Sequence, residues 1–185
     1  MIRHKKYAIQ EGAINIENIQ NILNNIQVVE EPKLPFPQAD SFERVINLCE
    51  LLKKKGVIIK NDITQNYDFY YRQTNYYSSA ARYLGLIKDV YENRQTGCSL
   101  TQEGFRIFNL PIVERQLEFV KLILTHTVFQ NTLNLYFEKG DAPTKDEVVE
   151  IMKEAQLYNI DSEQTYRRRA STIISWINWI LGLIE

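Results

Sequence analysis

The chain is poor in the residues that build metal centres, disulfide frameworks and phosphate-binding loops. Its 185 residues include only two cysteines, two histidines and seven glycines. Cys49, Cys98, His4 and His126 lack the spacing of zinc ligands, so we expect no structural metal. The glycines are scattered and form no glycine-rich phosphate loop. In a reducing compartment, both cysteines are expected to be free thiols.

Long apolar runs and a strong net charge are also absent. No apolar run approaches the length of about 18 residues that a membrane span requires. The basic N-terminus is not followed by the apolar core of a secretory signal. We therefore expect an intracellular, cytoplasmic protein with no membrane partner. The net charge of −1 argues against a protein that coats nucleic acid, although the distribution of charge matters more than its sum.

Proline is rare and concentrated near the N-terminus. Pro32, Pro35 and Pro37 predict an extended linker over residues 30–38, because proline interrupts a helix. Apolar residues at helical spacing precede it and predict one amphipathic helix: Ile16, Ile19, Leu23 and Ile26. Residues 1–38 are thus expected to form an N-terminal arm with a linker. The arm either packs on the body of the protein or serves in dimerisation.

Residues 39–111 are predicted to follow the order of a winged helix-turn-helix. Capping-box patterns begin helices at Asp40 and Asp62, and Gly56 is expected to end the first of them. The other predicted elements are a strand at 57–59, a helix at 72–83, strands at 86–91 and 98–100, and a helix from 101. In the turn at 93–97 between the last two strands, Gly97 is expected to take a positive φ.

Residues 112–185 repeat this plan more loosely. Both halves contain a helix that begins near Gln-Thr, bears arginines and ends in Leu-Gly-Leu-Ile, at residues 84–87 and 181–184. A capping box at Thr144 predicts a helix to about Ala155, and a longer helix is predicted over 163–179. Leu181 to Glu185 takes the place of a first wing strand with no return strand. The predicted fold is mainly α with small β wings, a tandem winged helix-turn-helix. Its domains are 39–111 and 112–185, and the second is truncated before its wing.

Positive charge gathers on the two arginine-bearing helices. Residues 69–87 hold two arginines and residues 164–184 hold three, with no acid in either stretch, whereas residues 138–163 hold eight acids and three lysines. Outward-facing Arg, Asn and Gln side chains are those that read base edges in the major groove. The candidate DNA-binding residues are Arg72, Gln73, Asn75, Tyr76, Ser79, Arg82, Arg94, Thr165, Arg167, Arg168, Arg169 and Thr172.

Simpler interpretations apply to the same residues. A polar helix face is usually only a solvated face, and Arg167 to Arg169 are able to form ion pairs with the acidic 138–163 segment. Trp176 and Trp179 are placed on or near the outward face and are expected to pack either against the other half or against chain that is missing from this sequence. His126 is expected to be a core histidine. Glu31-Pro32-Lys33 has the spacing of a metal-dependent nuclease motif but lies in the linker, so no catalytic site is assigned and enzyme activity stays open.

The phrases at 70–77 and 80–87, together with those at 165–172 and 175–179, resemble the N-terminal winged-helix region of certain type II restriction endonucleases. The resemblance implies a cytoplasmic bacterial or archaeal protein that recognises double-stranded DNA at a specific sequence. It also implies a separate nuclease domain or subunit, which would use Mg²⁺; this chain itself is expected to need no cofactor. A winged-helix transcriptional regulator and a protein-interaction scaffold are the alternatives. The DNA sequence recognised and the oligomeric state stay open.

Overall fold

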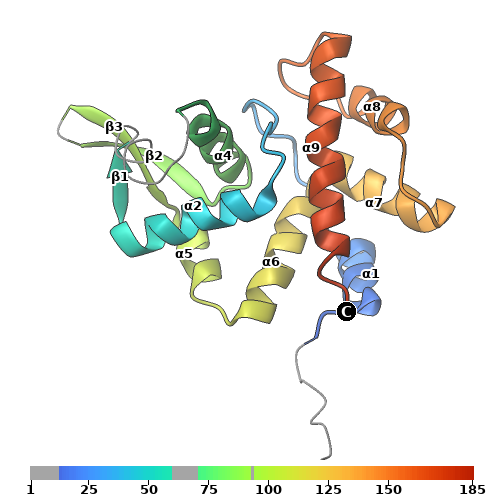
Figure 1. The fold of residues 1–185 in the computed structure, drawn as a ribbon, viewed down its shortest axis with the longest axis horizontal. Helices are drawn as coiled ribbons and strands as arrows, with labels where there is room; N and C mark the ends of the chain where they lie inside the picture. The colour runs from blue at the N-terminus through green and yellow to red at the C-terminus, as the bar shows by residue number, and fades with distance from the viewer. Residues whose placement is uncertain (1–12, 60–70, 93) are drawn as a thin grey trace, which may run out of the picture.

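The computed structural model describes residues 13–59, 71–92 and 94–185, and it is mainly helical with one small antiparallel sheet (Figure 1). This confirms the mainly α fold with a small β part. The described elements are α1 (Ile16–Asn25), α2 (Phe42–Lys55), β1 (Val57–Ile59), α4 (Tyr71–Tyr83), β2 (Ile87–Glu92), β3 (Gln95–Leu100), α5 (Gln102–Phe108), α6 (Ile112–Leu124), α7 (Thr127–Lys139), α8 (Lys145–Glu154) and α9 (Glu163–Leu181). The helix predicted to begin at Asp62 lies outside the described residues.

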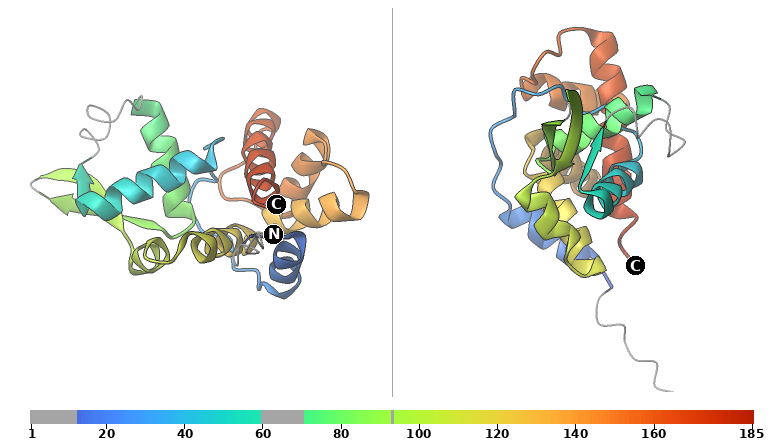
Figure 2. Two further views of the ribbon diagram at one scale, coloured as in Figure 1. Left: turned by 60° about the horizontal axis from the view of Figure 1, so that its bottom comes forward. Right: turned by 90° about the vertical axis from the view of Figure 1, so that its left-hand side faces the viewer.

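The sheet lies at one end of the molecule, and α7 and α8 lie at the other (Figure 2). Its strand order is β1-β3-β2, with β3 antiparallel to both neighbours. Gly97 lies within β3 opposite Ile59, not in the turn, so its predicted positive φ is wrong. A Cβ at Gly97 would lie 2.6 Å from the carbonyl oxygen of Ile58. Glycine is therefore required there for strand approach, while Arg94 supplies the positive φ of 64° in the turn.

Helix α2 begins one residue later than the predicted capping box. Ser41 is its N-cap but makes no side-chain cap hydrogen bond, and its hydroxyl donates to Glu43 instead. Asp40 lies before the helix, where its side chain accepts a hydrogen bond from α9. Gly56 ends the helix with a φ of 82°, as predicted.

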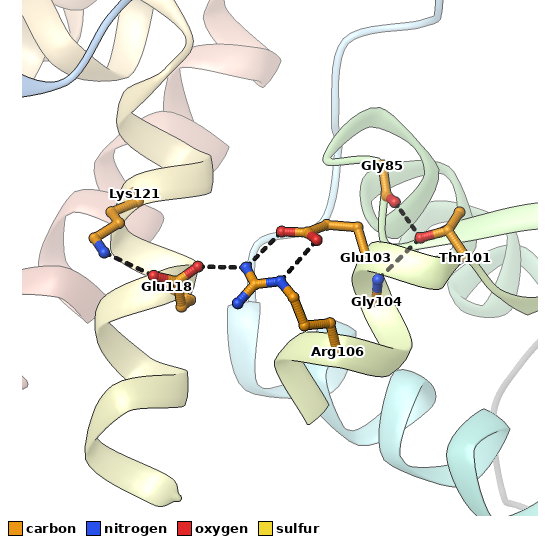
Figure 3. A network of polar contacts seen from close by, with 7 residues as sticks. All are labelled: Gly85, Thr101, Glu103, Gly104, Arg106, Glu118 and Lys121. Atoms are coloured by element: carbon orange, nitrogen blue, oxygen red, sulfur yellow. Dashed lines mark hydrogen bonds and ion pairs between the residues drawn. The ribbon is translucent and has the colours of Figure 1, made fainter. Parts of the chain in front are cut away.

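Thr101 and Gly104 join the start of α5 to the end of α4 (Figure 3). The Thr101 hydroxyl donates to the carbonyl of Gly85 at 2.6 Å and accepts from the backbone N–H of Gly104 at 3.0 Å. A Cβ at Gly104 would lie 2.2 Å from the carbonyl oxygen of Leu86. Thr101 is therefore required as a helix cap, and Gly104 is required because two backbone segments approach closely there.

A charged network joins α5 to α6 (Figure 3). Arg106 donates to both carboxylate oxygens of Glu103 and to Glu118, and Lys121 also donates to Glu118 at 2.7 Å. The hydrogen bond from Arg106 lowers the pKa of Glu103. Burial opposes ionisation of Glu118, but hydrogen bonds from Lys121 and Arg106 outweigh burial and lower its pKa as well.

Residues 112–185 form four helices and contain no strand. Helix α9 continues to Leu181, and Gly182 has a helical φ of −70°. The predicted first wing strand at Leu181 to Glu185 is therefore wrong. Gly85 in the matching phrase has a φ of +71°, so the two Leu-Gly-Leu-Ile phrases have different conformations. The backbone N–H of Glu185 donates to the carbonyl of Ile14, which places the end of this chain beside α1 (Figure 1).

A single hydrophobic cluster includes buried residues from both halves of the chain. Phe42 of α2 lies 4.9 Å from Trp176 and 4.5 Å from Trp179 between ring centroids. Trp176 also stacks on Phe129 of α7 at 5.2 Å. The two tryptophans thus pack against the other half, as predicted, but Trp176 is fully buried and its placement on an outward face was wrong. His126 is a buried residue, as expected.

The predicted capping box at the start of α8 is confirmed. Thr144 caps the helix, and Glu147 accepts from the backbone N–H of Thr144 at 2.7 Å. The Lys139 ammonium, together with these cap hydrogen bonds, lowers the pKa of Glu147 to about 2. No helix in the described part of the chain is long and apolar enough to cross a membrane.

We expect Glu147→Gln to be less stable than the wild type at neutral pH, by a difference that shrinks in acid. The folded-state pKa is depressed, so the Glu147 carboxylate stabilises the fold above the unfolded value of 4.5. That contribution is lost as the pH falls from 4.5 toward about 2. Urea unfolding at neutral pH and near pH 2 measures the change. Glu138→Gln is the control, because it makes the same substitution at an exposed residue that has no ion pair among the described residues.

Candidate nucleic-acid interface

The two helices predicted to contact DNA lie on opposite sides of one groove. Helix α4 supplies one wall, and α8 with the N-terminal half of α9 supplies the other, while the segment before α2 contributes two polar side chains. The groove has a volume of about 550 Å³, and its lining residues are Gln38, Asp40, Tyr76, Tyr77, Lys145, Gln164, Arg167, Arg168 and Ser171. Of the predicted site residues, the structure brings Tyr76, Arg167 and Arg168 together here.

The wall formed by α8 and α9 is positively charged. Lys145, Arg167 and Arg168 are exposed, and Asp40 is the acid in the lining. Arg167 pairs with Asp146 at 2.7 Å and with Glu163 at 3.6 Å, which confirms the ion pairs with the acidic segment for this arginine. Lys145 and Arg168 have no ion-pair partner among residues 13–59, 71–92 and 94–185. Their charges are therefore available to an anionic ligand.

The C-terminal side of the predicted α9 face is used within the protein. Thr172 is fully buried, and its hydroxyl donates to the Asp40 carboxylate at 3.1 Å. Arg169 is half-buried and donates to the side-chain oxygen of Gln38 at 2.8 Å, and burial lowers its pKa. Thr172 therefore faces Asp40 and Arg169 is turned toward Gln38, and a DNA contact by either residue stays a prediction from the sequence. The physical reason is that residues 38–40 cover this polar stripe.

Thr165 and Arg94 lie away from the groove lining. Thr165 is in the first turn of α9, where its hydroxyl lies 2.8 Å from that of the N-cap Ser162. Arg94 is exposed in the turn between β2 and β3, at the outer end of the sheet. Thr165 thus lies at the start of α9 and Arg94 at the tip of the hairpin, and neither residue lines the groove.

On α4, the residues that face the core are at helical spacing: Tyr77, Ala80 and Ala81 are buried, and so is Leu84 just after the helix. Tyr76 is 36% exposed and faces the groove, whereas Asn75 and Ser79 are half-buried. Arg82 forms an ion pair with Asp89 of β2, which holds it against the sheet. Arg72 and Gln73 lie in the first turn of α4, and their side chains are outside the described structure.

Sequence reasoning missed six of the nine groove residues, and one of these, Tyr77, is a buried residue of α4. Lys145 and Gln164 lie in the first turns of helices whose starts the capping signals mark, so their position near a helix end is readable from the sequence. Ser171 lies in the middle of α9. Gln38 had no such signal, because an extended linker does not indicate which helix it lies against. Asp40 was assigned to a helix cap, whereas its side chain accepts a hydrogen bond from α9. The described residues contain no group of three or more His, Cys, Asp or Glu that would hold a metal ion.

The fold and groove define a mainly helical protein with a basic cleft between two helices. Residues 44–185 match the family model described as "Domain of unknown function (DUF7226)". Because the match covers most of the chain, the chain belongs to this family. The matched region includes α4, α8 and α9, and thus both helical walls of the groove, but it does not include Gln38 or Asp40. Comparison with curated proteins and with solved structures gave no match.

Proposed function

We propose that the chain binds double-stranded DNA, with α4 reading bases and the wall formed by α8 and α9 contacting phosphates. One observation carries the proposal: two helices far apart in the sequence face one groove, where Lys145 and Arg168 are exposed cations without a described carboxylate partner. Positive side chains gathered along a groove attract a polyanion, and phosphate contacts supply most of the affinity.

The arrangement of residues 42–108 supports a winged helix for the first half. The described order is α2, β1, α4, β2, β3 and α5, and the hairpin β2–β3 pairs with β1 through β3. In such a fold α4 takes the position of the recognition helix, and the hairpin turn with Arg94 takes that of the wing. On this proposal, base contacts come from Tyr76 and Asn75 of α4, while contacts by Arg72 and Gln73 stay predictions from the sequence.

The second half takes a different part in this proposal. Thr172 and Arg169 are engaged with residues 38–40, so α9 is left with Gln164, Arg167, Arg168 and Ser171 toward the groove. Short polar and basic side chains of this kind bind phosphates and fix the position of the protein on the duplex, without reading sequence. We therefore propose one base-reading helix and one phosphate-contacting helix.

The double substitution Lys145→Ala with Arg168→Ala is expected to weaken binding to every duplex by a similar factor. It removes two phosphate contacts, so the slope of log affinity against log salt should become shallower by about 2. Fluorescence anisotropy with a labelled mixed-sequence duplex, titrated at several salt concentrations, measures both quantities.

The matched control is Arg106→Ala with Lys121→Ala, which removes the same two charges from outside the groove. Its salt slope should equal that of the wild type. Equal losses of affinity in the two double variants would mean that overall charge, and not the groove, attracts DNA. That result would refute the proposed site.

Protein interaction is a second candidate function. Phe105 and Ile112 are 53% and 55% exposed, on the α5–α6 side of the molecule. Exposed apolar side chains of this size are enriched at protein interfaces. If this function is the main one, the chain should show no salt-sensitive affinity for DNA. A link to type II restriction endonucleases, or to transcriptional regulation, stays a prediction from the sequence.

A further inference from the structure

The segment Glu31–Asp40, which leads from α1 into α2, contacts both halves of the protein along its length. We infer that this segment is a strap that holds α4 and α9 at a fixed separation, with Glu31 and Asp40 as its two anchors. The inference deepens the proposed function and rests on it, because the separation of these helices sets the width of the groove.

The need for a strap follows from how the helices pack. Helix α4 packs on α2 and β2, whereas α9 packs mainly on α7 and α8 and makes a smaller contact with α2. Neither helix therefore has the other as a main packing partner. The separation of α4 and α9 therefore depends on α2, which contacts both helices, and on any other segment that contacts both halves of the protein.

The first anchor is the carboxylate of Glu31. The hydroxyl of Tyr83, the last residue of α4, donates to Oε2 of Glu31 at 2.6 Å. Nδ1 of His126, between α6 and α7, lies 3.3 Å from Oε1. Burial and the nearby Glu31 charge raise the pKa of Tyr83, which keeps its hydroxyl as a donor. The rings of Tyr83 and His126 stack at 4.2 Å, so this anchor ties α4 to the second half.

The middle of the strap is held by an aromatic side chain. Phe36 is 3% exposed and lies between the two halves. Its ring centroid is 5.4 Å from that of Tyr83 and 5.8 Å from that of Phe129 on α7. Proline at 35 and 37 limits the conformations of the chain on both sides of Phe36.

The second anchor is a run of hydrogen bonds from α9 to three consecutive strap residues. Arg169 donates to Gln38, the Trp176 indole donates to the carbonyl of Ala39 at 2.7 Å, and Thr172 donates to the Asp40 carboxylate. The Ser175 hydroxyl donates to the carbonyl of Asp40. Because Gln38 and Asp40 also line the groove, the strap is part of the site as well as its support.

The test measures the separation of α4 and α9 directly in the full chain without DNA. Spin labels are attached to cysteines introduced by Ser79→Cys on α4 and Gln164→Cys on α9. Pulsed electron paramagnetic resonance then measures the distance between the two labels. Cys49 and Cys98 are buried free thiols, so the introduced cysteines react selectively. The strap variants are Asp40→Ala, Thr172→Val and the double Glu31→Ala with Asp40→Ala.

We expect each strap variant to broaden the distribution of distances between the two labels, and the double variant to broaden it most. Thr172→Ser, which keeps the hydroxyl that valine lacks, should show the wild-type distribution. Duplex affinity should fall about tenfold if about a tenth of the molecules keep a competent groove. The salt slope should not change, because no phosphate contact is removed. The matched control is Thr132→Val, which removes a buried hydroxyl that bonds only within α7.

Unchanged distances in the double variant would overturn the strap, even if DNA affinity fell. If Thr172→Val does not fold, Asp40→Ala decides, because the Asp40 residue is exposed and its removal leaves the core intact. If the wild type binds no DNA but the strap variants broaden the distances, the proposed function fails and the strap stands. Broadening of the same size in Thr132→Val would show general loosening and refute the strap.

Discussion

Trp176→Ala is expected to lower the free energy of unfolding by about 3–5 kcal/mol, the range for removing a large aromatic side chain from a core. Trp176 is fully buried and contacts both halves, with Phe42 on one side and Phe129 on the other. Its indole N–H also donates to the carbonyl of Ala39, which the substitution leaves buried without this partner. The loss therefore combines a cavity with an unpaired polar group.

Urea unfolding measured by circular dichroism tests this prediction. The matched variant Trp176→Phe keeps an aromatic ring in the core and loses the hydrogen bond to Ala39. It should be destabilised by about 1–3 kcal/mol, the cost of leaving a buried polar group unpaired. A loss below about 1 kcal/mol for Trp176→Ala, smaller than a core aromatic deletion causes, would show that the two halves do not share this core.

Gly104→Ala is expected to destabilise the protein by about 3 kcal/mol, at the upper end of overpacking costs. The added Cβ would lie 2.2 Å from the carbonyl oxygen of Leu86, so α5 or the short segment between α4 and β2 must move. Such a movement also disturbs the hydrogen bonds of Thr101 with Gly85 and Leu86. A backbone group has no alternative rotamer that would relieve the contact.

Gly182→Ala is the matched control for Gly104→Ala. Gly182 is exposed at the end of α9 with a φ of −70°, a conformation that alanine adopts readily. Its stability should change by less than about 0.5 kcal/mol, as is usual for surface substitutions. Thermal or urea unfolding compares the two variants. Equal stability of both alanine variants would contradict the close approach of α5 to residue 86.

Most of the elements of the fold are predictable from local signals. The capping box at Thr144, the helix end at Gly56 and the cap at Thr101 each involve residues close in sequence, so the local pattern is sufficient. The apolar positions of α4 are likewise predicted by helical periodicity. These are the levels at which sequence and structure agree.

The errors occurred where a distant segment determines the environment. Thr172 and Ser175 belong to a polar face of α9, and periodicity identifies that face without showing what covers it. The covering segment is the extended chain at 38–40, more than a hundred residues earlier in the sequence. Trp176 was placed outward for the same reason, although it is the centre of the aromatic core.

The repeated Leu-Gly-Leu-Ile phrase shows how a short identity misleads. After α4, Gly85 takes a positive φ and the chain enters β2, which has β3 as a partner. After α9, Gly182 stays helical, and Leu183 and Ile184 pack on the core near α1. A strand forms only where a neighbouring strand satisfies its backbone groups, and four identical residues do not supply that neighbour.

The salt dependence of duplex binding by the wild-type chain tests the central claim most directly. Anisotropy titrations with a mixed-sequence duplex at about 50 mM and about 200 mM salt give the two affinities. If Lys145 and Arg168 each contact a phosphate, the affinity should fall about 12-fold between these conditions. An absence of binding at the lower salt concentration, or an affinity that does not change with salt, would contradict a DNA-binding groove between α4 and α9.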